Sequence, residues 1–93
     1  MFSAIYPVKD LTDKSKWDPW IQEQLKKVQT AFADGINIDI EDPVENGSDE
    51  ASLLTQLVAQ TYKTFKDANT NYKVSVLQCM YIENMCVHAC TCD

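Results

Sequence analysis

The chain has 93 residues, of which 45% are apolar, and its fourteen acidic and eight basic side chains give a formal net charge of -6 at pH 7. This length allows one small domain and excludes two, because a typical domain holds ~100 to 150 residues. The acidic balance argues against nucleic acid and anionic membrane surfaces as partners, which are bound through clustered Lys and Arg, and no apolar run approaches the ~20 residues of a membrane span.

An apolar stripe at helical spacing predicts a first helix over residues 17–32. The stripe residues recur every three or four positions, which places them on one helix face. They are Trp17, Ile21, Leu25, Val28 and Phe32. Asp18 followed by Pro19 is typical of an N-cap and a first helical position, and Gly35 is expected to stop the helix.

From Ile36 the apolar period changes to two, which predicts a strand with one apolar and one polar face. Its last polar residue lies at the carboxyl end, the end that carries the active site in (β/α) barrels. The apolar face consists of Ile36, Ile38 and Ile40, and the polar face of Asn37, Asp39 and Glu41. Periodicity alone leaves open that these acidic residues only keep a solvent-facing side of the strand hydrated.

A polar loop over residues 42–50 separates this strand from a second predicted helix. The loop contains Pro43 and Gly47, and the helix begins near Ser48 or Asp49 and ends at residues 69–71. Its predicted buried face consists of Leu54, Leu57, Val58, Tyr62 and Phe65. The aromatic residues of the two helices, Trp17, Trp20, Tyr62 and Phe65, are interpreted as core residues rather than as sugar-stacking platforms.

Residues 72–76 alternate in polarity and predict a second, short strand. The predicted order is therefore helix, strand, helix, strand. Strands that alternate with helices of this length are typical of parallel α/β units, in which each helix crosses back over the sheet. The expected fold class is α/β with a parallel sheet.

The segment Asp34-Gly-Ile-Asn37-Ile-Asp39-Ile-Glu41 resembles the Asp-x-x-Asp-x-Asp-x-Glu signature on the fourth barrel strand of glycoside hydrolase family 18. It has Asn37 where most members of the family have Asp. In this it is similar to the di-N-acetylchitobiase branch, which also has Asn at that position. The resemblance extends over residues 8–76. It implies a partial (β/α)8 TIM barrel of about two βα units, since a complete barrel needs ~200 residues or more.

The resemblance also implies an activity and the residues that carry it. The reaction is substrate-assisted, retaining hydrolysis of N-acetylglucosamine linkages in chitobiose-type or glycoprotein-derived oligosaccharides, without a cofactor or a metal. Glu41 would act as general acid and then as base, and Asp39 would orient the acetamido group and stabilise the developing positive charge. Asn37 would support Asp39, and Asp34 would serve the start of the strand.

Further consequences of the resemblance concern location and completeness. Relatives of this branch are lysosomal, although Met1–Lys9 has neither the basic start nor the apolar run of a secretory signal. Asn46-Gly-Ser48 is a glycosylation sequon, which matters only in the secretory pathway. With later strands of the barrel missing, the chain is expected to be inactive alone. The alternative hypothesis is a non-catalytic interaction fragment with exposed sheet edges.

The tail over residues 77–93 departs from the family pattern. It holds all four cysteines, Cys79, Cys86, Cys90 and Cys92, and it is interpreted as a product of alternative splicing, a retained intron or a faulty gene model. It lacks the Cys-x-x-Cys knuckles typical of structural zinc sites, and its spacing selects none of the three disulfide pairings that four cysteines allow. The acidic residues between Asp34 and Glu50 also do not fit a calcium loop, whose glycine stands at the sixth position.

Overall fold

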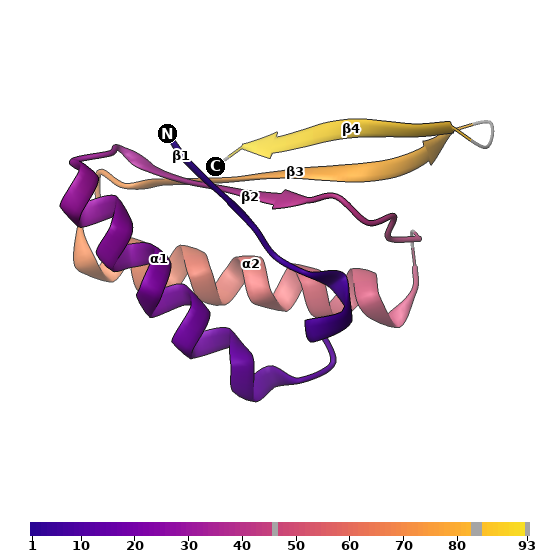
Figure 1. The fold of residues 1–93 in the computed structure, drawn as a ribbon, viewed down its shortest axis with the longest axis horizontal. Helices are drawn as coiled ribbons and strands as arrows, with labels where there is room; N and C mark the ends of the chain where they lie inside the picture. The colour runs from indigo at the N-terminus through magenta and orange to yellow at the C-terminus, as the bar shows by residue number, and fades with distance from the viewer. Residues whose placement is uncertain (46, 83–84, 93) are drawn as a thin grey trace.

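A four-stranded sheet carries both long helices on one of its faces in this computed structural model (Figure 1). The structure describes residues 1–45, 47–82 and 85–92, with the backbone alone beyond residue 78. Its strands are β1 (Phe2–Ile5), β2 (Gly35–Ile40), β3 (Lys73–Ile82) and β4 (Met85–Cys92), and its helices are α1 (Trp17–Ala31) and α2 (Asp49–Ala68). Two short 3-10 turns, Val8–Asp10 and Lys14–Lys16, join β1 to α1.

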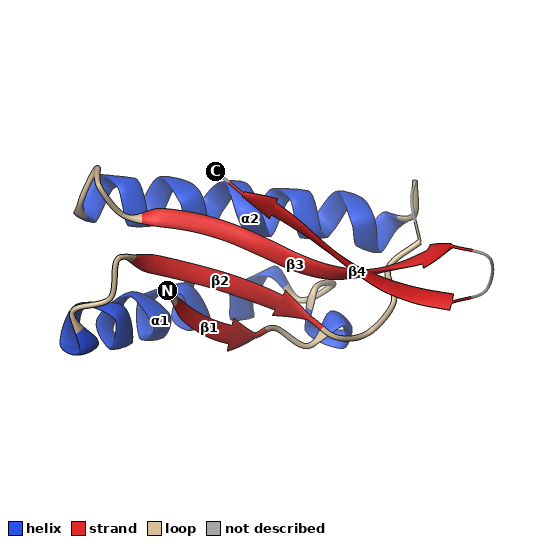
Figure 2. Ribbon diagram, turned by 90° about the horizontal axis from the view of Figure 1, so that it is seen from above, coloured by secondary structure: helices blue, strands red, loops and turns tan. Residues whose placement is uncertain are grey.

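The strands follow the order β1-β2-β3-β4 across the sheet (Figure 2). Strands β1, β2 and β3 run parallel, and α1 and α2 provide the two crossovers between them. This arrangement confirms the α/β class and the parallel sheet expected from the sequence. Strand β4 returns antiparallel along β3 and covers the edge of β3 that β2 leaves open.

The hydrophobic core lies between the sheet and the two helices. Ile36, Ile38 and Ile40 of β2 are fully buried, as the period of two predicts. Ile21 and Val28 of α1 and Leu57 and Phe65 of α2 are also fully buried. These side chains come from helix stripes that the sequence identifies, so the core was largely predictable.

Two residues assigned to the core from helical spacing are exposed instead. Phe32 is 95% exposed, because α1 ends at Ala31 and Phe32 takes a left-handed conformation with φ of 55° at its C-cap. Tyr62 is 42% exposed, and the buried position beside it belongs to Thr61, whose hydroxyl donates to the Leu57 carbonyl at 2.8 Å. Because its hydroxyl is hydrogen-bonded within the helix, Thr61 can be buried there although it is polar.

The residues predicted to cap and stop α1 were wrong at both ends, although its span, Trp17–Ala31, differs from the predicted residues 17–32 by one residue. The N-cap is Lys16 rather than Asp18, because a 3-10 turn, stabilised where the Asp13 side chain accepts from the Ser15 amide, leads directly into the helix. Gly35 does not stop the helix and is instead the first residue of β2. For α2 the prediction was correct, since Ser48 caps the helix by accepting from the Ala51 amide at 3.2 Å.

Sheet elements at both ends of the chain were not predicted. β1 was missed, and β3 runs beyond residue 76 to Ile82 before β4 pairs with it. β1 was missed because a four-residue strand is too short to show a clear period. The end of β3 and the whole of β4 were missed because the tail does not resemble the family and was therefore interpreted separately. Strand β3 continues across the predicted domain boundary at residue 76 without a break. The boundary separates residues that resemble the family from a tail that does not, and it stays a prediction.

Tyr6 anchors the segment between β1 and the first turn. Its side chain is 2% exposed, its ring lies 4.9 Å from that of Trp20, and its hydroxyl donates to the Asp10 carbonyl at 3.2 Å. Burial, together with the nearby carboxylates of Asp10 and Asp13, raises the pKa of Tyr6 to about 12. The folded protein therefore holds this proton more tightly than the unfolded chain does.

We expect the Tyr6 proton to make stability fall with alkaline pH. Below pH ~10 Tyr6 is protonated in both states, whereas between pH ~10 and ~12 only the unfolded chain loses the proton, so the free energy of unfolding decreases by about 2 to 3 kcal/mol. Urea unfolding of the wild type and of Tyr6→Phe across this range measures the difference. Equal slopes in the two proteins would contradict the assignment.

Candidate functional site

The polar residues of β2 lie on the sheet face opposite the two helices. Because the isoleucines of this strand point into the core, Asn37 and Asp39 must face the other way, and both are half-buried. Figures 1 and 2 show that α1 and α2 both lie on the isoleucine side. The polar face of the central strand is therefore not covered by either helix.

Asn37 is connected to both neighbouring strands by its side chain. Its Oδ1 accepts a hydrogen bond from the Ser75 hydroxyl of β3 at 2.8 Å, and its Nδ2 donates to the Ser3 hydroxyl of β1 at 3.5 Å. The register explains the set, since Ser3, Asn37 and Ser75 are aligned across the three parallel strands. Ser75 is 5% exposed, so the shorter of these bonds is largely shielded from water.

Asp39 lies one step further along the same face. Its backbone carbonyl accepts from the Tyr6 amide at 3.1 Å, which fixes the strand at this point. Its Oδ1 is buried, and within the described part of the chain this atom has no hydrogen-bond partner. A buried carboxylate oxygen without a donor costs about 1 to 3 kcal/mol or more, so this position favours an additional N–H or O–H group beside it.

Glu41 follows the carboxyl end of β2 directly and its side chain is exposed. Two residues along an extended chain span ~7 Å, so Glu41 lies one such step beyond Asp39. The predicted strand had included Glu41, but the regular pairing stops at Ile40. An exposed carboxylate at the end of a strand can exchange a proton with a bound molecule.

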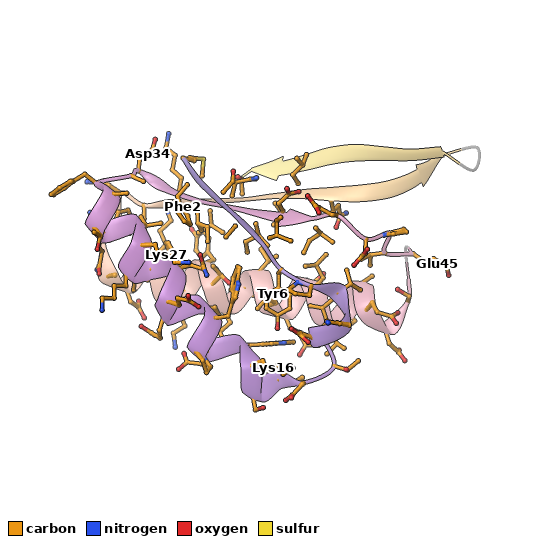
Figure 3. The ribbon with its side chains drawn as sticks, in the orientation of Figure 1. Phe2, Tyr6, Lys16, Lys27, Asp34 and Glu45 are labelled. Atoms are coloured by element: carbon orange, nitrogen blue, oxygen red, sulfur yellow. The ribbon has the colours of Figure 1, made fainter. Side chains whose placement is uncertain are left out.

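Asp34 lies at the other end of β2, about 20 Å from Glu41 by the rise of a strand. Its side chain is 67% exposed and forms an ion pair with the Met1 amino group at 3.4 Å, and its carbonyl accepts from the Lys73 amide at 3.0 Å (Figure 3). It therefore lies at the start of the strand and is not brought to the other three residues, and its role stays a prediction. The sequon residue Asn46 lies outside the described residues.

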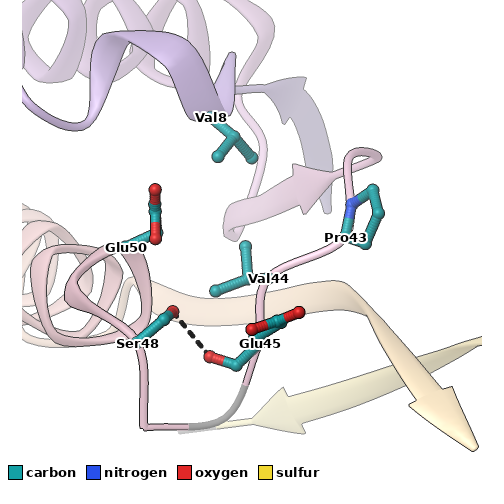
Figure 4. Close-up of a pocket in the computed structure, with 6 residues that line it drawn as sticks. All are labelled: Val8, Pro43, Val44, Glu45, Ser48 and Glu50. Carbon is teal, nitrogen blue, oxygen red and sulfur yellow. Dashed lines mark hydrogen bonds between the residues drawn. The ribbon is translucent and has the colours of Figure 1, made fainter.

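An open pocket lies beyond the carboxyl ends of β1 and β2 (Figure 4). Its volume is about 400 Å³. It is lined by Val8, Pro43, Val44, Glu45, Ser48 and Glu50. Neither Asp39 nor Glu41 lines it, although it adjoins the loop that begins at Glu41. The pocket was not predicted, because its residues come from the 3-10 turn after β1, the loop after β2 and the first turn of α2, which the parallel pairing of β1 and β2 brings together.

Ser75 is the site residue that sequence reasoning overlooked. It belonged to the polar face of the second predicted strand, and the parallel register places it beside Asn37. We expect Ser75→Ala to lower the free energy of unfolding by about 1 to 2 kcal/mol, because it removes the short bond to Asn37 Oδ1.

Ser52→Ala is the matched control for that substitution. Ser52 is exposed on α2 and accepts only a long, 3.5 Å bond from Gln56, so its loss should change the free energy by less than about 0.5 kcal/mol. Urea denaturation of the two variants gives the comparison. Equal losses would show that the bond from Ser75 contributes nothing.

Among the described residues, no three His, Cys, Asp or Glu side chains are grouped as a metal site, and no described helix is long and apolar enough to cross a membrane. The site described above therefore consists of carboxylates, an amide and hydroxyls on one strand and its two neighbours. Such a set can donate and accept hydrogen bonds and can transfer a proton through Glu41.

Several proteins named as di-N-acetylchitobiases are similar to the chain. It is 43% identical over 76 residues to "Probable di-N-acetylchitobiase 1" of Dictyostelium discoideum, an alignment that covers 82% of the chain and 20% of that protein. It is 38% identical over 76 residues, with the same coverage, to "Probable di-N-acetylchitobiase 2" of that organism. It is 41% identical over 58 residues to the human "Di-N-acetylchitobiase", covering 62% of the chain and 15% of that protein.

The chain spans about a fifth of the length of the two Dictyostelium relatives. No family model matches the chain, and no solved structure matches it. The similarity therefore identifies a chitobiase-like segment.

Proposed function

We propose that this chain carries the proton-transfer strand of a glycosidase that cleaves N-acetylglucosamine linkages in chitobiose-type or glycoprotein-derived oligosaccharides. The observation that carries the proposal is the pair on β2, in which exposed Glu41 follows Asp39 with its buried, unpartnered oxygen. The similarity to proteins named di-N-acetylchitobiase supports the substrate class. A neutral sugar also suits a chain with a net charge of -6.

Glu41 is the proposed proton donor. As the acetamido carbonyl of the substrate attacks the anomeric carbon, the Glu41 carboxyl protonates the glycosidic oxygen and the leaving sugar departs. The resulting carboxylate then takes a proton from the water that opens the oxazolinium-like intermediate, so that the anomeric configuration is retained and Glu41 regains its proton. Exposure at the end of β2 gives Glu41 access to both the leaving group and water.

Asp39 is the proposed partner of the acetamido group. Its carboxylate would accept a hydrogen bond from the acetamido N–H, which aims the carbonyl at the anomeric carbon, and its charge would stabilise the positive charge that develops. The lack of a donor for Asp39 Oδ1 supports this role, because the substrate would supply one. Asn37, oriented by Ser75, would steady the Asp39 side chain without adding a third negative charge.

The fragment fits two βα units of a (β/α)8 barrel of glycoside hydrolase family 18. The three parallel strands with helices on one side match the wall of such a barrel, in which helices lie outside and the other face looks inward. Ile5 supports this placement, because it is aligned with Asp39 on the uncovered face and is 54% exposed. A closed barrel would bury it. By the same resemblance, the proposed location of the complete enzyme is the lysosome.

A non-catalytic interaction fragment is the second candidate function. β1 is an edge strand, and Ile5 and Phe32 are 54% and 95% exposed, so apolar groups are available for a companion segment. Under this proposal the chain would bind its partner with Glu41 unused. The two candidates agree that the chain alone is inactive, and they differ in what happens when the missing part of the barrel is supplied.

A hybrid enzyme supplies that missing part. Residues 8–76 of this chain replace the aligned segment of the Dictyostelium discoideum relative, and circular dichroism first shows that the hybrid is folded. We expect it to release the fluorophore from a di-N-acetylchitobioside at a rate within about tenfold of the parent enzyme. A folded hybrid without activity would favour the interaction fragment over the glycosidase.

A further inference from the structure

The outer edge of β4 is the longest unpaired strand edge in the described part of the chain. On one side β4 pairs with β3 from Met85 to Cys92, and among the described residues no strand pairs with its other side. Figure 1 shows β4 at the outer margin of the sheet, away from both helices. Because backbone groups alternate in direction along a strand, every second residue of β4 presents its N–H and C=O groups to a further strand.

The sequence of β4 lacks the features that protect edge strands from pairing. Natural edges are protected by charged residues, above all Lys, by Pro, by bulges or by a very short strand. Strand β4 has the sequence Met85-Cys-Val-His-Ala-Cys-Thr-Cys92, with no Lys, Arg, Asp, Glu, Pro or Gly. Its register with β3 runs over all eight residues without a bulge. Uncharged segments of this length without Pro or Gly are the kind that pair with other chains.

The edge strand on the other side of the sheet, β1, is less suited to pairing. It has four residues, Phe2–Ile5, and Pro7 follows it closely without an N–H to donate. The Met1 amino group at its start forms an ion pair with Asp34 at 3.4 Å, so charged groups lie beside the strand. The edge of β1 is therefore half as long as that of β4 and is protected at both ends.

A second copy of the chain is the occupant that fits the β4 edge. We propose that two copies pair antiparallel along β4 about a twofold axis, which joins their two four-stranded sheets into one continuous sheet. A backbone edge is self-complementary under such an axis, and an interface that uses the same edge twice closes at a dimer. Each copy has a net charge of -6, but β4 brings no carboxylate to the contact.

The symmetry determines which residues of β4 meet. Two antiparallel strands in one sheet are related by an axis perpendicular to the sheet, so the long helices of both copies lie on the same face. An axis at His88 or Ala89, in the middle of β4, gives the longest overlap. A residue at the axis lies opposite itself, and its neighbours lie close to their own copies. The dimer uses neither Asp39 nor Glu41, so it does not depend on the proposed glycosidase activity.

Sedimentation velocity of the full chain, with reductant present throughout, tests the proposal. We expect the mass to rise from that of one chain to that of two as the concentration increases. His88→Lys should raise the dissociation constant of the dimer by about tenfold or more, because the two added charges lie close together across the axis. Ser3→Lys is the matched control, since it puts a Lys on the edge strand β1, and it should change the constant less than about threefold.

Three results would overturn the proposal: a monomer at every concentration, equal weakening by the two substitutions, or assemblies larger than a dimer. The second would show that β1 takes part, and the third is expected if β4 of one copy pairs with β1 of the next, because that contact does not close.

Hydrogen exchange of the wild type gives a second readout that does not depend on whether His88→Lys folds. Amides of β4 should exchange more slowly at high than at low protein concentration, whereas amides of β1 should not change. Exchange of β4 that is independent of concentration would contradict the dimer.

Discussion

Glu41→Gln in the hybrid enzyme should lower kcat by about 10² to 10⁴-fold and leave KM within a few-fold of its original value. The amide occupies the same volume but has no acidic proton for the glycosidic oxygen and cannot accept one from water, and a positioned acid–base group contributes this much to the rate. Initial rates with a di-N-acetylchitobioside over a range of concentrations give both constants.

Asp42→Asn is the control for that substitution. It makes the same carboxylate-to-amide change at the next residue, which is also exposed but belongs to the loop after β2. We expect its kcat to stay within about twofold of the unmodified hybrid. A similar loss in both variants would point to a general effect of charge on this loop, and full activity in Glu41→Gln would exclude Glu41 as the proton donor.

Gly35→Ala should unfold most of the chain. A Cβ atom built on Gly35 would lie 2.0 Å from the carbonyl oxygen of Lys73 and 2.6 Å from its amide nitrogen, and both are backbone atoms of the paired strand β3. Strands β2 and β3 would have to separate where the Lys73 amide donates to the Asp34 carbonyl. We expect a loss of about 4 kcal/mol or more, which is close to the whole stability of a small domain.

Gly47→Ala is the matched control for this glycine. Gly47 has a φ of +80°, which costs an alanine about 1 kcal/mol, but no atom lies within 4 Å of the added Cβ. Circular dichroism and urea unfolding of the two variants should therefore show a mostly unfolded Gly35→Ala protein and a slightly destabilised Gly47→Ala protein. A cooperative, wild-type-like transition for Gly35→Ala would contradict the close approach of β2 and β3.

The part of the fold that sequence predicted best is the part with long, regular periods. Leu54, Leu57 and Phe65 of α2 and the alternating isoleucines of β2 are buried as expected, because burial of one face dictates where apolar residues recur. The role of Gly35, in contrast, was predicted wrongly. Its local context matches a helix stop, whereas the actual constraint comes from Lys73, 38 residues further along and invisible to a local rule.

The candidate site was predictable as a set of residues on one strand, but its connections were not. Asn37, Asp39 and Glu41 follow from the period of two and the family resemblance. The partners of Asn37, Ser3 and Ser75, depend on which strands are neighbours and on their register.

The most direct test of the central claim, that Glu41 donates the proton, compares two leaving groups. The Glu41→Gln hybrid is assayed on di-N-acetylchitobiose, whose departing sugar needs a proton, and on an aryl N-acetylglucosaminide with a strongly acidic phenol, which departs without one. We predict that the substitution slows the first reaction at least tenfold more than the second. Equal losses on both substrates would contradict proton donation by Glu41.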